Sequence, residues 1–340
     1  MIDRNHPDFS SPVQEEIWNA ATDLVPLERT LSAIPEEYHR PCTDYYNYVT
    51  DLLNNLYDDP ETYLAASDVV TYIRWFWVFL YKAFSYEDGV FFIDSDGYKK
   101  FVNKMGKPLI GILTERMGMR FTETDGTVRV TNDVYPQMMI AVHDVMAAAY
   151  KHYNVNCTDY LTMCDFRALV NYKRTYEDMI VLLNDRGREM AERLCVYAAE
   201  HGIKPAKCTY FNRVEFKKKG KIVFILDVVS GKNLKVNIGF AELGGAAFEL
   251  MREDIDSYDD RDAFAHYLRA NLKKCTACNP DCPKRANPVE LFGLKTVFCQ
   301  PFLRMFDPKA EEFAYLCRLI SLRDKVVCAG VSEVFYPGNG

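Results

Sequence analysis

The sequence predicts an α+β protein in which a mostly helical amino-terminal domain, residues 1–165, precedes an antiparallel-sheet domain, residues 166–340. Three observations lead to this prediction. The chain has 340 residues, more than one typical hydrophobic core supports. The spacing of its apolar residues changes from helical to strand-like near residue 206. The turns that follow this change are short, and short turns make neighbouring strands antiparallel.

Composition and charge narrow the class of protein. A content of 49% hydrophobic and 26% charged residues is that of an ordinary globular chain. The formal net charge is -7, which argues against a general nucleic-acid binder, because such proteins need a basic surface. The amino terminus reads MIDRNHPDFSSPVQEEIW and has neither the apolar core of a signal peptide nor the acid-poor pattern of a transit peptide. We therefore expect a cytoplasmic protein.

Helices are expected through most of the first domain. The pattern predicts one helix over residues 11–31 and another that includes residues 63–84, YLAASDVVTYIRWFWVFLYKAF. Aromatic side chains at helical spacing usually pack in a core, although an aromatic ligand pocket is an alternative. Asp68, Arg74 and Lys82 interrupt this segment, which falls short of the roughly 20 apolar residues of a membrane span. We expect a buried helix and no membrane insertion.

A β-hairpin is expected within this helical domain. The stretch MRFTETDGTVRVTN alternates apolar and polar residues around Asp125-Gly126, the dipeptide that favours a type I′ turn. It follows a helix that Ser95 or Asp96 is expected to cap, and precedes another over residues 136–150. Helix, hairpin and helix could form a winged-helix DNA-binding regulator. The hairpin carries acids as well as arginines, which makes this the less favoured alternative.

The second domain is expected to open with a long amphipathic helix that ends at Gly202 and Pro205. Three antiparallel strands then follow in CTYFNRVEFKKKGKIVFILDVVSGKNLKVNIGF, with turns at residues 219–220 and 230–233. A helix after the acidic run REDIDSYDDRDAF, a strand in GLKTVFC and a helix from Asp307-Pro308 continue the domain. A last short strand is expected at Val326-Val327.

The cysteines indicate a metal site. Eleven cysteines without a secretion signal point to a reducing compartment, not to a disulfide framework. Four of them are grouped as C-x2-C-x3-C-x16-C, namely Cys275, Cys278, Cys282 and Cys299. Four thiolates can surround one Zn²⁺ ion as a tetrahedron, with zinc–sulfur bonds of about 2.3 Å. We predict a structural zinc site at these four residues, in which no open coordination position is left for catalysis.

Two alternatives to zinc remain open. An iron-sulfur cluster also takes four thiolates, and Cys282-Pro283 is similar to the end of ferredoxin motifs, although the internal spacings differ. The C-x2-C pair could instead cycle between thiols and a disulfide. Lys273 and Arg285 are among the basic residues that flank the group and would offset the negative charge of four thiolates, which favours the metal.

Residues 175–325 contain, in this order, the hairpin YFNRVEFKKKGKIVFIL, a helix, CTACNPDC, GLKTVFC, FLRMFDP and a final helix. This order of elements resembles the carboxy-terminal part of a group of uncharacterised bacterial cytosolic proteins. The resemblance implies that the four cysteines act together. It implies nothing about catalysis, because the group has no assigned activity.

The sequence contains no familiar catalytic motif: it has no G-x-S-x-G, no H-E-x-x-H and no Walker lysine. We therefore predict a non-catalytic binding or regulatory module that presents a concave sheet face or an interdomain cleft to a small molecule or a protein partner. The alternative is an enzyme whose groups converge only in three dimensions. Its candidate catalytic residues are Asp254, Asp256 and His143, and an iron-sulfur cluster would add redox chemistry.

Overall fold

The computed structural model describes residues 11–59, 69–153, 157–206, 212–229, 232–239, 254, 256–271, 289–291, 294–296 and 302–328. The chain folds into two compact units, Met1–Tyr172 and Lys173–Gly340. Both units combine helices with antiparallel strands, so the predicted α+β class is confirmed. The units divide between Tyr172 and Lys173, whereas the sequence pattern placed the division after residue 165.

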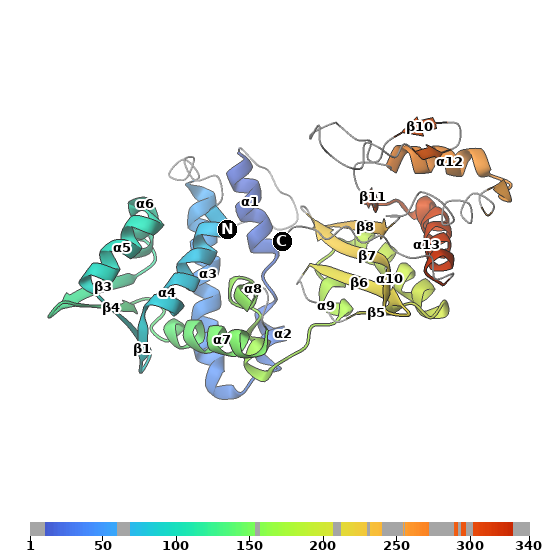
Figure 1. The fold of residues 1–340 in the computed structure, drawn as a ribbon. Helices are drawn as coiled ribbons and strands as arrows, with labels where there is room; N and C mark the ends of the chain where they lie inside the picture. Colours follow the sequence, from blue (N-terminus) through green and yellow to red (C-terminus); the bar gives the residue numbers. More distant parts are fainter. Residues whose placement is uncertain are drawn as a thin grey trace. The chain divides into compact units, whose positions relative to one another are not determined.

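The first unit is rich in helices. Those described are α1 (Pro12–Thr22), α2 (Leu27–Leu31), α3 (His39–Asp58), α4 (Val69–Ala83), α5 (Ser95–Met105), α6 (Lys107–Glu115), α7 (Met138–His152) and α8 (Cys157–Thr162), with 3-10 turns η1 (Glu36–Tyr38) and η3 (Phe166–Val170). Helix α3 packs against α1 and α7 (Figure 1). Its buried residues Tyr45, Tyr48 and Leu52 recur every three or four positions, which turns one face of α3 into the core.

The single helix predicted over residues 11–31 is two helices. Ser11 caps α1, because its hydroxyl accepts a hydrogen bond from the backbone N–H of Gln14 at 3.3 Å. Pro26 then interrupts the helical pattern, since a proline disfavours helical geometry in the residue before it. Helix α2 begins at Leu27, directly after this proline.

Helix α4 is a core helix, as predicted from its aromatic residues. Phe76 and Trp77 are each 1% exposed. The indole ring of Trp77 packs edge-on against the rings of Tyr45 and Tyr48, with centroids 5.4 and 5.6 Å apart. Residues 60–68, where this helix was expected to begin, lie outside the described residues. Within the described ranges, no helix is both long and apolar enough to span a bilayer.

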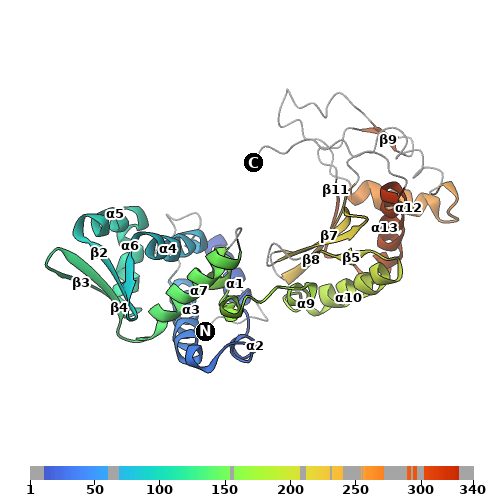
Figure 2. The same cartoon turned by 60° about the horizontal axis from the view of Figure 1, so that its bottom comes forward.

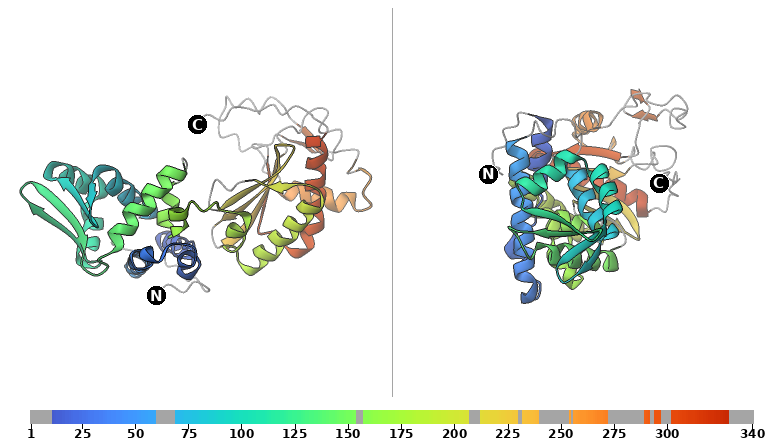
Figure 3. Two further views of the ribbon diagram at one scale, coloured as in Figure 1. Left: turned by 90° about the horizontal axis from the view of Figure 1, so that it is seen from below. Right: turned by 90° about the vertical axis from the view of Figure 1, so that its left-hand side faces the viewer.

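The described strands of the first unit form a four-stranded antiparallel sheet in the order β1-β2-β4-β3. They are β1 (Ser85–Glu87), β2 (Val90–Asp94), β3 (Met119–Thr124) and β4 (Thr127–Asn132). The predicted hairpin is confirmed: β3 pairs with β4 around Asp125 and Gly126, whose φ angles of 50° and 76° suit a type I′ turn. Helices α5 and α6 pack against this sheet (Figure 3, left).

The residue that caps α5 differs from the prediction. Asp94, the last residue of β2, accepts a hydrogen bond from the backbone N–H of Gly97 at 2.8 Å, whereas Ser95 and Asp96 lie inside the helix. Gly106 then ends α5 with a φ angle of 87°, a conformation that favours glycine. One side chain therefore joins the end of a strand to the start of a helix.

The second unit contains a five-stranded antiparallel sheet in the order β11-β8-β7-β6-β5. Its strands are β5 (Lys204–Pro205), β6 (Arg213–Lys218), β7 (Lys221–Val229), β8 (Asn233–Gly239) and β11 (Phe302–Phe306), and a separate pair is formed by β9 (Val289–Leu291) and β10 (Leu294–Thr296). The three strands predicted after residue 206 are thus confirmed as β6, β7 and β8. The described helices are α9 (Tyr176–Ile180), α10 (Asp185–Glu200), α12 (Arg261–Asn271) and α13 (Phe313–Cys328), with the 3-10 turn η6 (Ala310–Glu312).

Two predictions in this unit are wrong. The long helix expected at its start is split into α9 and α10, because Asn184 caps α10 by accepting a hydrogen bond from the N–H of Gly187 at 2.8 Å. The strand expected at Val326-Val327 is the last part of α13, where both side chains are buried on the face of a helix. The strand propensity of two β-branched residues is smaller than the stabilisation they gain from burial in this helix.

The sheet of the second unit has two different faces. One is apolar: Phe216, Phe224 and Ile238 occupy paired positions on β6, β7 and β8 and are buried. Helices α10 and α13 lie beside these strands (Figure 2) and contact β8. Gly187 of α10 is packed so closely that a Cβ atom there would lie 3.3 Å from Leu234, on the same apolar face. The core of this unit is therefore formed between the helices and this face.

Candidate functional site

The predicted zinc ligands Cys275, Cys278, Cys282 and Cys299 lie outside the described residues. The metal site therefore stays a prediction. Among the residues that the structure describes, no three histidine, cysteine or acidic side chains come together as a metal site would require.

Two of the described cysteines in the second unit are free thiols of low reactivity. Cys195 and Cys317 lie in helices of the second unit. Burial raises the pKa of Cys195 to about 12 and that of Cys317 to about 11. Both thiols are thus protonated at neutral pH, and only the thiolate is nucleophilic. Neither is a candidate nucleophile.

The candidate catalytic acids are ion-pair partners. Asp254 forms an ion pair with Lys325 of α13. It also accepts a hydrogen bond from the Tyr258 hydroxyl at 3.3 Å. Asp256 pairs separately with Arg261, Nη1 to Oδ1 at 3.2 Å. Each carboxylate is thus neutralised by its own cation. These separate ion pairs do not bring Asp254 and Asp256 together as a pair of catalytic groups.

His143, the third candidate, lies on α7 and contacts both a carboxylate and an aromatic ring. Its Nδ1 lies 2.7 Å from the Oδ1 atom of Asp144. Its imidazole stacks on the ring of Tyr86 from β1, with centroids 3.9 Å apart and the planes 6° from parallel. Burial and the Asp144 carboxylate together raise the pKa of Tyr86 to about 12, so this phenol stays protonated. The imidazole is therefore held at one nitrogen and on one face, with 31% of the side chain exposed.

A second candidate site lies on the other face of the second unit's sheet. Polar and charged side chains occupy the positions that alternate with the apolar, helix-covered residues of the same strands. We call this surface the charged sheet face, which consists of Arg213, Glu215, Lys217, Asp227, Lys235, Asn237, Arg304 and Phe306.

Asp227 organises the centre of this face. It lies on β7, is 7% exposed, and accepts a hydrogen bond from the Nδ2 atom of Asn237 on β8 at 2.7 Å. Lys235, its neighbour in register, contacts the same carboxylate through Nζ at 2.8 Å. On β6, the Nε atom of Arg213 lies 3.7 Å from Asp227, too far for a hydrogen bond. One carboxylate thus orders two side chains of β8 and lies near a third on β6.

Arg304 lies beside this network without such a partner. Its register partner on the neighbouring strand is Asn237, and its Nε atom is buried with no hydrogen-bond acceptor in the part of the chain that the structure describes. The same is true of the Arg213 Nε atom. The two arginines flank Asp227 and Asn237 through the strand pairing. The face therefore offers donors whose acceptors the described protein does not supply.

Phe306 adds an apolar group to the same face. It follows Arg304 by two residues on β11, so both side chains point to one side of the strand. Phe306 is 62% exposed, and the Nζ atom of Lys235 lies 6.0 Å from the centroid of its ring. A large exposed aromatic side chain thus lies next to a guanidinium group.

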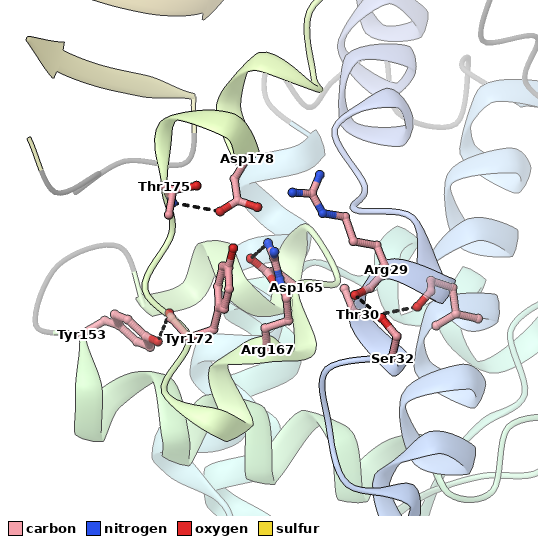
Figure 4. Close-up of polar contacts among 10 residues, drawn as sticks. Arg29, Thr30, Ser32, Tyr153, Asp165, Arg167, Tyr172, Thr175 and Asp178 are labelled. Atoms are coloured by element: carbon pink, nitrogen blue, oxygen red, sulfur yellow. Dashed lines mark hydrogen bonds and ion pairs between the residues drawn. The ribbon is translucent and has the colours of Figure 1, made fainter. Parts of the chain in front are cut away.

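Another charged cluster, in the first unit, is structural. Asp165 and Arg167 are 0% and 3% exposed, and Arg167 contacts both carboxylate oxygens, Nε to Oδ1 at 2.7 Å and Nη2 to Oδ2 at 3.0 Å. The Arg167 guanidinium carbon lies 4.1 Å from the ring centroid of Tyr172, whose carbonyl accepts a hydrogen bond from Tyr153 (Figure 4). This ion pair stabilises the 3-10 turn η3 near the end of the first unit.

In comparisons with known proteins, no family model, curated protein or solved structure matches this chain. Sequence reasoning did not single out Asp227, Asn237 or Arg304. A signal was available, because KIVFILDVV and FLRMF each place a charged residue inside an apolar strand. Such a residue is costly unless a partner or a ligand pairs with it.

Proposed function

We propose that this protein is a ligand-binding module and that the charged sheet face is its binding surface. The observation that carries this proposal is the pair of arginine Nε donors, on Arg213 and Arg304, that flank an ordered network on one face of a sheet. A buried donor without an acceptor costs about 1–3 kcal/mol, and this cost is recovered when a bound group supplies the acceptor. A ligand that supplies acceptors explains the two donors.

The arrangement also has the composition of a binding site. Ligand sites combine apolar surface with a few polar groups whose positions are fixed in advance. Asp227 fixes Asn237 and Lys235 through contacts of 2.7 and 2.8 Å, and Phe306 supplies exposed apolar surface. Because these groups are held before a ligand arrives, little ordering entropy is lost on binding.

A fragment screen observed by amide NMR tests the binding surface. Fragments that bind the full chain are expected to shift the amide resonances of Asp227, Asn237 and Arg304 together. The Asp227→Asn variant keeps the size of the side chain and loses the charge that orders its neighbours, so the same fragments should bind it more weakly. Fragments that bind and shift resonances only on other surfaces of the protein would refute this function.

We also propose that Cys275, Cys278, Cys282 and Cys299 hold a structural Zn²⁺ ion that braces the second unit. Their spacing supports this proposal, because three ligands come from eight residues of chain and a fourth follows after sixteen more. Such a site is closed, so its contribution is to folding and not to chemistry. The binding function and the metal are separate proposals, and each has its own test.

A second candidate function, an enzyme, is favoured by one observation: the contact between His143 and Asp144. A carboxylate that holds Nδ1 fixes the tautomer of an imidazole and leaves Nε2 as the basic nitrogen, an arrangement suited to general acid–base chemistry. The stacked Tyr86 ring fixes the orientation of the imidazole plane.

The reactivity of His143 tests this candidate, and the chain offers a matched control. His201 also stacks on a tyrosine, Tyr197, at 4.0 Å, but its Nδ1 faces the Tyr197 carbonyl at 2.7 Å in place of a carboxylate. At pH 8, diethyl pyrocarbonate is expected to acylate His143 several-fold faster than His201, as measured by peptide mass spectrometry. The Asp144→Asn variant should remove that difference. Equal rates in the unaltered protein would remove the support for an activated imidazole.

A further inference from the structure

We infer that the charged sheet face binds the carboxylate of an organic acid that also carries an apolar or aromatic group, with Arg304 as the residue that contacts the carboxylate. This inference rests on the proposed function of the face as a binding surface and adds the chemical class of the ligand.

The distribution of charge on the face indicates a negatively charged ligand. Lys217 pairs with Glu215, Nζ to Oε2 at 2.8 Å, and Lys235 pairs with Asp227 at 2.8 Å. Arg304 is a cation of this face for which the described residues provide no ion pair. The face carries four cations, Arg213, Lys217, Lys235 and Arg304, against the two carboxylates Glu215 and Asp227, and this excess of positive charge favours an anion such as a carboxylate.

The geometry of an arginine favours a planar acceptor. A guanidinium presents parallel N–H groups that match the two oxygens of a carboxylate, and charge-assisted hydrogen bonds of this kind are short and strong. The buried Nε of Arg304 is one of these donors. An oxygen placed against Nε satisfies it, while the second oxygen meets a terminal nitrogen of the same fork.

A phosphate fits this face less well. A phosphate monoester carries close to two negative charges at neutral pH. Lys235 and Arg213 already contact the Asp227 carboxylate, which leaves Arg304 as the cation that is free to form a close pair with a ligand. The buried Asp227 carboxylate would also repel a dianion more than a monoanion, because like charges repel strongly where water is excluded.

The apolar part of the ligand follows from Phe306. Residues two apart on one strand have Cα atoms about 7 Å apart and share a face of the sheet. A carboxylate on Arg304 therefore places the next few carbon atoms of an organic acid along β11 toward the exposed ring of Phe306. Covering this ring removes apolar surface from water, which adds affinity that acetate or formate would lack.

Titration of the full-length protein with 3-phenylpropionate, observed by amide NMR, tests the inference. The acid is expected to shift the resonances of Asn237, Arg304 and Phe306. The neutral 3-phenylpropionamide should bind at least tenfold more weakly, because it lacks the charge that pairs with Arg304. Inorganic phosphate should bind more weakly than the acid.

Two variants identify the groups responsible. Arg304→Gln keeps a polar side chain and removes the charge, and it is expected to weaken binding of 3-phenylpropionate roughly tenfold to a hundredfold. Phe306→Ser should also weaken the binding of 3-phenylpropionate. Acetate, which has no aromatic group, should bind the unaltered protein and this variant equally. Lys218→Gln is the matched control, because Lys218 is the next cation on β6 but pairs with Asp324 of α13, outside the charged sheet face. It should leave the affinity within about twofold.

The outcomes separate this inference from the proposed function. If acid and amide bind the face equally, or phosphate binds more tightly than the acid, the ligand is not a carboxylic acid but the face is still a binding surface. If the acid shifts only resonances outside the charged sheet face, the carboxylate site is refuted. The fragment screen then tests separately whether this face is a binding surface. The comparison of acid, amide and phosphate on the unaltered protein holds even if Arg304→Gln fails to fold.

Discussion

Replacing Arg167 by methionine is expected to destabilise the first unit by about 3–5 kcal/mol, the usual cost of removing one partner from a buried ion pair. Asp165 and Arg167 are 0% and 3% exposed, and the guanidinium contacts both carboxylate oxygens. Methionine fills a similar volume but leaves the carboxylate without these two hydrogen bonds. Tryptophan fluorescence during urea unfolding measures the effect on this unit alone, because all three tryptophans, Trp18, Trp75 and Trp77, belong to it.

Two controls make this experiment specific. The double variant Asp165→Leu/Arg167→Met removes both charges and should recover much of the lost stability, as is observed when apolar residues replace a buried pair. Lys99 and Asp96 form an ion pair at 3.3 Å whose side chains are 73% and 83% exposed. The Lys99→Met variant should change stability by less than about 0.5 kcal/mol. A cost this small for Arg167→Met would show that the pair is not desolvated in solution.

Replacing Cys278 by serine is expected to destabilise the second unit by several kcal/mol and to lower the zinc content of the purified protein. In the proposed site, metal binding and folding are coupled, so the loss of one of four ligands lowers the stability of the unit that contains them. Amide hydrogen exchange of β6, β7 and β8 measures the loss, because the sheet of this unit contains no tryptophan. The tryptophan signal of the first unit should not change.

Cys328→Ser is the matched control for this variant. Cys328 is an exposed thiol at the end of α13 in the same unit, and its loss should alter neither exchange nor zinc content. Metal analysis of protein purified without added metal distinguishes the alternatives. A brown protein that contains iron and sulfide would show that the four cysteines hold an iron-sulfur cluster and not zinc. Colourless protein without metal, in which Cys278→Ser exchanges as the unaltered chain does, would end the four-cysteine proposal.

The parts of the fold that the sequence predicted correctly depend on neighbouring residues. Asp125 and Gly126 have the positive φ angles of a tight hairpin, as do Lys219 and Gly220 in the turn between β6 and β7. Turn chemistry acts within four residues, and alternation within a strand acts over two, so both are readable from the order of residues.

The errors occurred where a local pattern had two solutions. Residues 90–94 form the short strand β2, for which the sequence analysis made no prediction, because an apolar run of four residues is compatible with either a strand or a buried helix. Val326 and Val327 favour a strand by their branched side chains, yet α13 continues through them because it buries both. Asn184 caps α10 inside what resembled one long helix, and a cap is recognised with certainty only from its hydrogen bond.

The candidate site shows the same limit more strongly. The sequence by itself predicted that Asp227 and Asn237 lie in strands and alternate with apolar neighbours, whereas the strand that carries Arg304 was not predicted. It did not determine that they lie together, because β11 is separated from β8 by more than sixty residues of chain and could have paired with other edges. Strand order and register are decided by which faces bury the most apolar surface against the helices, a sum over the whole unit. Only that tertiary choice places Arg304 next to Asn237 and leaves a charged face opposite the core.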